Sequence, residues 1–134
     1  MLLALDLGRR RTGAALGDRQ SDFVFALSTI RAQNDDDLLE AVFQCVHQRK
    51  ITEIVAGLPR LLDGSEGEQA QWIRGISTAI KARTGIPVQL IDERYTSYGA
   101  AHGSDPDAKA ACSLAEIALK IGDHYSMKRN HKKR

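Results

Sequence analysis

The stretch LLALDLGRRRTGAALGD, residues 2–18, carries one carboxylate, Asp6, between an apolar run and a turn with three consecutive arginines. Residues 2–8 form a short apolar run that ends on Asp and Gly, which is typical of a strand buried on both faces. Residues 12–18 predict a second strand, and residues 23–30 predict a third after a polar turn. The first thirty residues therefore predict an antiparallel meander whose first strand ends on an acid.

The rest of the chain alternates helical and strand patterns. In order, we expect a helix over residues 34–50, a strand over 53–59, a helix ending before Gly85, a strand over 87–94, and a helix over 104–125 with Pro106 in its first turn. This order predicts an α/β fold: a five-stranded mixed sheet, with the first three strands antiparallel and the last two parallel, flanked by helices. Ligands of such sheets collect beyond the carboxyl ends of the parallel strands, where Asp6, Gly57 and Glu93 fall.

The composition is that of one globular domain. The chain has 134 residues, of which 43% are hydrophobic and 27% charged, and this length suits one continuous core. No apolar run approaches the ~20 residues that a bilayer span requires. The N-terminus shows no pattern of a secretory signal, and Cys45 and Cys112 lie in helix patterns where buried thiols are favoured over a disulfide. We therefore expect a cytoplasmic protein without membrane association.

The net charge of +2 is unevenly distributed. The last nine residues hold five lysines or arginines and no acid, so residues 1–125 carry a net charge of about −3. We expect residues 1–125 to form the domain and residues 126–134 to be a basic, flexible tail. Such a tail either neutralises nucleic-acid phosphates in a salt-dependent way or is only a solvated terminus.

Carboxylates close two of the predicted strands: Asp6 ends the first, and the pair Asp92 and Glu93 ends the fifth. Mg²⁺ prefers oxygen ligands and is commonly held by one or two carboxylates plus waters and substrate phosphates. In phosphodiester hydrolysis, two ions ~3.5–4 Å apart can activate water and stabilise the leaving oxygen. Arg11 and Arg94 could bind the phosphate. Alternatively, these acids are turn residues in a surface ion-pair cluster worth under ~1 kcal/mol.

Three motifs in order carry a family resemblance. Residues 6–15 read Asp-x-Gly-x-x-Arg-x-Gly-x-Ala, residues 57–67 read GLPRLLDGSEG, and residues 92–97 read DERYTS. Along nearly its whole length the chain resembles the YqgF (RuvX) family of Holliday junction resolvases, also described as pre-16S ribosomal RNA nucleases, within the RNase H-like superfamily. The resemblance implies an RNase H-like fold and divalent-metal nuclease chemistry.

The resemblance also implies roles for individual residues. Asp6 and Glu93 would be catalytic acids that hold Mg²⁺ or Mn²⁺. Substrate contacts would lie in the three motifs, at Arg11, Gly57, Asp63, Gly64, Arg94, Thr96 and Ser97.

The third acid of the family is an Asp that opens the last helix in an Asp-x-x-Ala-Ala pattern. Here the segment reads CSLAE, so Cys112 stands where that Asp is expected. Glu116, one turn further along, is the first substitute to consider; Asp105 and Asp123 on the same helix face are alternatives. If Glu116 is only a solvated residue, the site would hold metal weakly or not at all.

The leading functional interpretation is a metal-dependent nuclease acting on structured nucleic acid, with precursor 16S ribosomal RNA as the first substrate to test. A resolvase of Holliday junctions or other branched DNA is the alternative, and it would require a homodimer that presents two sites. A non-catalytic nucleic-acid-binding relative that has lost the third acid is a further alternative. Residues 3–16 also resemble the first phosphate loop of sugar kinases and actin-like ATPases, but 134 residues cannot supply their second domain.

Overall fold

The computed structural model describes residues 1–93 and 106–132, and side chains up to residue 121. The elements are β1 (Leu2–Asp6), β2 (Arg11–Gly17), β3 (Val24–Ala26), β4 (Ile30–Arg31), α1 (Asp35–Arg49), β5 (Glu53–Leu58), α2 (Glu68–Thr84), β6 (Val88–Asp92) and α3 (Pro106–Lys132). None of the helices in this described part of the chain combines the length and hydrophobicity that a membrane span requires.

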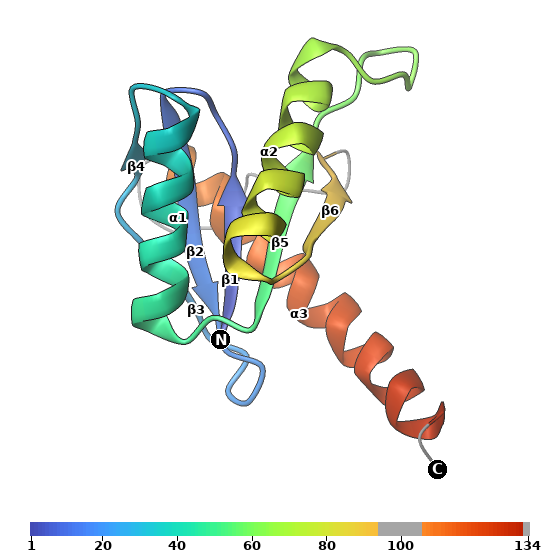
Figure 1. Cartoon of the computed structure of the whole chain (residues 1–134). Coiled ribbons are helices and arrows are strands. Elements are labelled where there is room, and N and C mark those ends of the chain that lie inside the picture. The colour runs from blue at the N-terminus through green and yellow to red at the C-terminus, as the bar shows by residue number, and fades with distance from the viewer. Residues whose placement is uncertain (94–105, 133–134) are drawn as a thin grey trace.

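The strands form one mixed sheet in the order β3-β2-β1-β5-β6, with β4 pairing β2 beyond this path. Strands β1 to β4 pair antiparallel, whereas β5 is parallel to both β1 and β6. Figure 1 shows the sheet between α1 and α2 on one face and α3 on the other. The predicted α/β fold with its mixed sheet is confirmed.

The strand predicted over residues 23–30 is split into β3 and β4, which raises the strand count from the five predicted. Ala26 pairs with Ala15, but Ile30 pairs with Thr12. Three residues therefore lie opposite two on β2, and this one-residue mismatch is a β-bulge. The apolar pattern of the segment does not indicate where such an extra residue sits, which is why the sequence predicted one strand.

Alternation along β1 divides the core into two layers. Leu3 and Leu5 pack under α1 and α2, whereas Leu2 and Ala4 pack under α3. All four side chains are fully buried, as expected of a strand covered on both faces. Even-numbered residues of β1 consequently point toward α3, which fixes the direction of Asp6.

Capping residues explain the bounds of α1. Asn34 accepts a hydrogen bond from the Asp37 N–H at 2.8 Å, and the first turn carries three acids, which suit the positive end of the helix dipole. At the other end, Lys50 adopts a left-handed conformation with φ 53°. The helix predicted over residues 34–50 is therefore present, and its predicted bounds include the two cap residues.

Helix α3 begins at Pro106 and runs to Lys132, seven residues beyond the predicted end at residue 125. The division of the chain into a domain and a tail at that point stays a prediction. Alanines on α3, including Ala111 and Ala115, are buried against the sheet, so the helix lies close to it.

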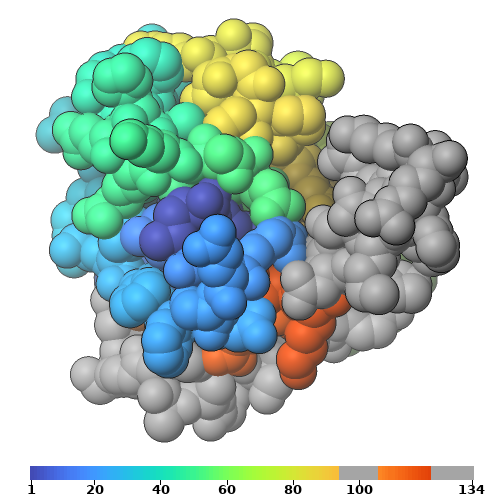
Figure 2. Space-filling view, turned by 90° about the horizontal axis from the view of Figure 1, so that it is seen from below, coloured from blue at the N-terminus to red at the C-terminus, as the bar shows by residue number. Residues whose placement is uncertain are grey.

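The end of the sheet opposite to Asp6 is closed by contacts between distant segments. Arg19, in the turn between β2 and β3, forms an ion pair with Glu53 and donates to the carbonyl oxygen of Leu119 at 3.2 Å. The Thr52 N–H donates to the Met1 carbonyl oxygen at 2.9 Å. In Figure 2, which views this end, the N-terminal residues lie between the segments near residues 20 and 50. These contacts fix the sheet at the end opposite to Asp6 and Glu93.

Candidate active site

Three positions at the carboxyl ends of β1, β5 and β6 face α3. Asp6 is the last residue of β1, Gly57 lies near the end of β5, and Glu93 directly follows β6. Each is two residues beyond a side chain that packs in the layer under α3: Ala4, Val55 and Ile91. Because side chains alternate along a strand, all three positions point to the same face of the sheet.

Gly57 provides the space in which Glu93 lies. A Cβ atom at position 57 would be 2.8 Å from Glu93 Oε1 and 2.9 Å from its Cγ. The Glu93 side chain therefore lies over β5, the strand between β1 and β6, and this brings its charge near Asp6. Gly57 was predicted to contact substrate; its place in the structure is under a candidate acid.

Burial and the charges of neighbouring carboxylates disfavour the ionised form of both acids. Burial raises the pKa of Asp6 above its usual range, and the negative charge of Asp107 raises it further. Burial likewise raises the pKa of Glu93, followed by the charges of Asp6 and Asp92. Partly buried carboxylates whose pKa values are raised by neighbouring negative charges form a cluster that a cation would stabilise.

Asp107, in the first turn of α3, is a site residue that the sequence reasoning missed. In the ladder Asp6 lies opposite Gly13, and a Cβ atom at Gly13 would be 2.1 Å from the Asp107 carbonyl oxygen. The absence of a side chain at position 13 thus lets α3 begin directly on β2, beside Asp6. The signal was present in the sequence, because residues 107–111 read Asp-Ala-Lys-Ala-Ala and so carry the Asp-x-x-Ala-Ala pattern themselves; the placement of that pattern at Cys112 was wrong by five residues.

Arg11 forms an ion pair with Asp107, with 2.9 Å between Nη2 and Oδ2. The Arg11 side chain is 53% exposed and the Asp107 side chain 26%. Arg11 was predicted to bind phosphate; in the structure its guanidinium contacts an acid and keeps about half of its surface open to solvent. It lies on the same face of β2 as Gly13, again because side chains alternate.

Cys112 and Glu116 lie further along α3. Cys112 is fully buried in the layer between the sheet and α3, and burial, followed by the charge of Glu116, raises the pKa of its thiol. Glu116 is nine residues after Asp107, which corresponds to about 13 Å along the helix axis. Among the described side chains, Asp107 is thus the α3 carboxylate whose charge acts on Asp6.

Several predicted site residues lie outside the described part of the structure. These are Arg94, Thr96, Ser97 and Asp105, and the side chain of Asp123. Their roles stay predictions.

The oxygen-only donor set of Asp6 and Glu93 fits a hard divalent cation, which typically takes one or two carboxylates together with waters and substrate phosphates. Within residues 1–93 and 106–121, no three His, Cys, Asp or Glu side chains converge closely enough to hold a metal ion by themselves. The geometry therefore matches a site that water or substrate oxygens complete.

The loop between β5 and α2 is tied to the end of β6. Arg60 Nε donates to Asp92 Oδ2 at 3.0 Å, and Arg60 Nη1 donates to the Gly64 carbonyl oxygen at 3.2 Å. Asp63 accepts from the Ser65 N–H at 2.9 Å. The loop that carries the predicted contacts Asp63 and Gly64 is consequently fixed next to the residue preceding Glu93.

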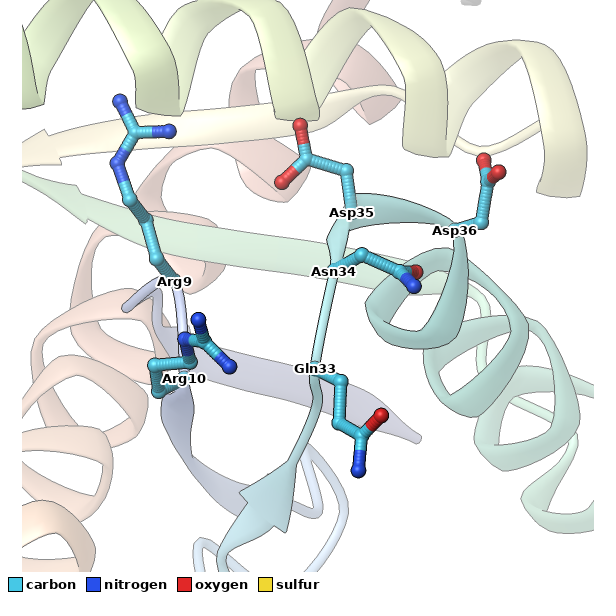
Figure 3. A pocket seen from close by; sticks show the side chains of 6 residues that line it. All are labelled: Arg9, Arg10, Gln33, Asn34, Asp35 and Asp36. Carbon is cyan, nitrogen blue, oxygen red and sulfur yellow. The ribbon is translucent and has the colours of Figure 1, made fainter.

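A pocket of ≈ 480 Å³ lies between the turn that follows β1 and the start of α1. Figure 3 shows Arg9 and Arg10 on one side and Asn34 and Asp35 on the other. The Arg9 guanidinium lies 4.9 Å from the centre of the Trp72 ring, and Trp72 Nε1 donates to Asp35 Oδ1 at 3.2 Å. Arg9 therefore contacts α2, which covers the face opposite to α3.

Comparisons with known proteins agree with this arrangement of elements and motifs. The "Putative pre-16S rRNA nuclease" of Anaeromyxobacter sp. (strain K) is 36% identical over 98 residues, which cover 73% of this chain and 72% of that protein. A protein of the same name from Chloroflexus aurantiacus is 30% identical over 126 residues, which cover 90% of this chain and 82% of the relative.

Solved structures share the fold. Thermus thermophilus RuvC in complex with a Holliday junction substrate matches with a TM-score of 0.60 at 11% identity, covering 90% of this chain and 95% of that one. The fowlpox virus Holliday junction resolvase matches with a TM-score of 0.54 at 8% identity, covering 90% and 98%. At these identities the likeness shows the fold alone, and it confirms the RNase H-like fold that the motifs implied.

A family model described as "RuvX: Holliday junction resolvase" matches residues 1–113. The match includes both strand acids, the glycine-rich loop and the first turn of α3. The chain therefore belongs to the RuvX family, as its three motifs predicted.

Proposed function

We propose that this protein is a divalent-metal-dependent nuclease that hydrolyses phosphodiester bonds in structured nucleic acid, with precursor 16S ribosomal RNA as its substrate. The observation that carries the proposal is the pair Asp6 and Glu93, held on one face of the sheet over Gly57 with raised pKa values. The names of the curated relatives favour ribosomal RNA as the substrate. A cytoplasmic location, expected from the sequence, is part of this proposal.

Asp6 and Glu93 would hold Mg²⁺ or Mn²⁺, which when bound supplies Lewis-acid polarisation and an activated water. Asp107 would serve as the third acid, because it is the Asp of the Asp-x-x-Ala-Ala pattern at residues 107–111. Its proximity to Asp6 supports this role better than the position of Glu116 does. The partly exposed Arg11 would keep Asp107 in place and donate to a substrate phosphate.

A cleavage assay with matched variants tests the proposal. Wild type is incubated with a precursor 16S RNA fragment and Mg²⁺ or Mn²⁺, beside Asp6→Asn, Glu93→Gln and Asp107→Asn. Each substitution should lower cleavage by about 100-fold or more, because each removes a negative charge in or beside the metal site. Glu116→Gln is the control, and its cleavage should stay within about threefold of wild type, since Glu116 lies ~13 Å from Asp107 along the helix axis.

The outcomes separate the assignments. Equal cleavage by wild type and the variants at Asp6 and Glu93 would show that the site is wrong. If Glu116→Gln loses cleavage and Asp107→Asn does not, the third acid is Glu116 and not Asp107. Binding of RNA without cleavage under either metal would favour the non-catalytic alternative.

Branched DNA is the second candidate substrate, because the matching family model is described as a Holliday junction resolvase. A four-way junction in the same assay tests it. Symmetric cleavage of the junction should coincide with a dimer in sedimentation, since two opposed cuts require two sites. Cleavage of the RNA fragment alone, by a monomer, would exclude this second function.

A further inference from the structure

Leu62 lies at the tip of the loop between β5 and α2 and is the most exposed of the large apolar side chains in the described part of the chain. Its relative exposure is 110%, compared with 64% for Phe23 and 55% for Leu61. Single exposed leucines are common on protein surfaces and need no explanation by themselves. What distinguishes Leu62 is how the loop presents it and where.

Hydrogen bonds fix the turn that carries Leu62. The Gly64 N–H donates to the Leu61 carbonyl oxygen at 2.9 Å, and the Leu61 N–H donates to the Ser65 carbonyl oxygen at 2.8 Å. Ser65 N–H also donates to Asp63 Oδ1 at 2.9 Å. Leu62 is therefore held at the outer corner of a closed turn, and little conformational entropy remains to be lost when it contacts a ligand.

The turn is also fixed relative to the candidate active site. The ion pair between Arg60 and Asp92, with 3.0 Å between Nε and Oδ2, joins the loop to the residue before Glu93. Leu62 is five residues beyond Gly57, so it lies within about 17 Å of it along even a fully extended chain. This distance corresponds to about five base steps along one strand of a duplex. Figure 1 shows the loop projecting beyond the sheet at the end where β5 finishes.

The charges of the loop do not favour phosphate at its tip. Arg74 and Arg60 both pair with Glu66, at 2.6 Å and 3.7 Å. Hydrogen bonds from Ser65 lower the pKa of Asp63, which keeps a negative charge next to Leu62. A phosphate would be repelled there, whereas the face of a nucleobase offers apolar surface to the leucine.

We propose that Leu62 is a wedge that packs against a nucleobase near the cut and separates it from its neighbour in the stack. The inference rests on the proposed nuclease function and adds how that site selects structured substrates. Apolar side chains inserted between base steps unstack them and bend the duplex. Opening of the helix by Leu62 would give the phosphodiester access to the carboxylates on the face of the sheet.

The test uses the full chain and two probes, a precursor 16S RNA hairpin and a four-way DNA junction. A series of substrates is prepared, each with a single 2-aminopurine. The labelled position is moved through about five positions on either side of the cut, because the loop reaches about that far. Leu62→Ala removes the wedge, and Leu62→Met keeps its apolar length. Phe23→Ala is the matched control, because Phe23 is exposed and lies in the turn at the opposite end of the sheet.

Wild type, Leu62→Met and Phe23→Ala should raise the 2-aminopurine fluorescence at one position, and Leu62→Ala should not. On a fully paired substrate Leu62→Ala should lower kcat/KM about tenfold. On a substrate mismatched at that position it should stay within about twofold of wild type, because the step is already unstacked. Unchanged thermal unfolding of Leu62→Ala shows that the loss is not one of folding.

Equal fluorescence and cleavage of wild type and Leu62→Ala would overturn the wedge while leaving the nuclease function intact. The same loss on paired and mismatched substrates would overturn it as well, since Leu62 would then contribute only general affinity. If wild type neither binds nor cleaves either probe, the proposed function itself fails and the wedge with it.

Discussion

Replacing Gly13 by alanine tests the contact that brings α3 to the candidate site. The new Cβ would lie 2.1 Å from the Asp107 carbonyl oxygen, so reaching even 3.0 Å requires a movement of 0.9 Å. The obstacle is helix backbone, which cannot rotate away as a side chain can, and Gly13 does not adopt a positive φ that would add a second effect. Overpacking of this kind costs about 2 kcal/mol.

The loss should appear in both stability and catalysis. For a chain of this size, about 2 kcal/mol corresponds to a fall in Tm of about 6–10 °C. Because Asp107 moves with the first turn of α3, a displacement near 1 Å should also reduce cleavage by about 100-fold. Thermal unfolding followed by circular dichroism gives the first quantity, and RNA cleavage well below Tm gives the second.

Gly75→Ala is the matched control. Gly75 lies in α2, and a Cβ atom added there would meet no atom of the described residues within 4 Å. The substitution should therefore raise stability by about 0.5–1 kcal/mol and leave cleavage unchanged. If Gly13→Ala behaved like Gly75→Ala, the close contact between β2 and α3 would not exist in solution, and the placement of Asp107 beside Asp6 would fall with it.

Two further predictions concern charge and capping. Asp6→Asn, measured without divalent metal, should raise the free energy of unfolding at neutral pH. The raised pKa of Asp6 means that its ionisation destabilises the fold. The gain in stability should therefore be absent below about pH 4 and should grow as pH rises through the folded-state pKa. Urea unfolding at several pH values measures this, and a gain that persisted in acid would contradict it. Asn34→Ala should lower stability by about 1 kcal/mol by removing the cap of α1; an unchanged urea midpoint would show that the cap contributes nothing.

The strand-borne half of the site could be predicted from the sequence because it depends on local rules. Asp6 and Glu93 each follow an apolar run, and parallel strands bring their carboxyl ends to the same edge. Alternation then sets the face to which each side chain points. The prediction required no knowledge of how the helices dock.

The helix-borne half was also present in the sequence, but the pattern that carries it was placed five residues too far along the chain. The sequence indicated that the last helix begins near Pro106, but the position of Asp107 depends on where α3 crosses β2. That crossing is set by Gly13, more than ninety residues earlier in the chain. Residues 107–111 carry the Asp-x-x-Ala-Ala pattern, and placing that pattern at residues 112–116 instead directed attention to Cys112 and Glu116.

The burial of Cys112 has a consequence for protein engineering. An aspartate introduced at this position would not add an acid to the candidate site, because the Asp of the Asp-x-x-Ala-Ala pattern is Asp107 and the Cys112 side chain lies fully buried in an apolar layer. A carboxylate there would lose its hydration without gaining a hydrogen-bond partner from that layer, a cost of several kcal/mol. In this chain Cys112→Asp would damage the scaffold, and any redesign of the candidate site has to start from the first turn of α3.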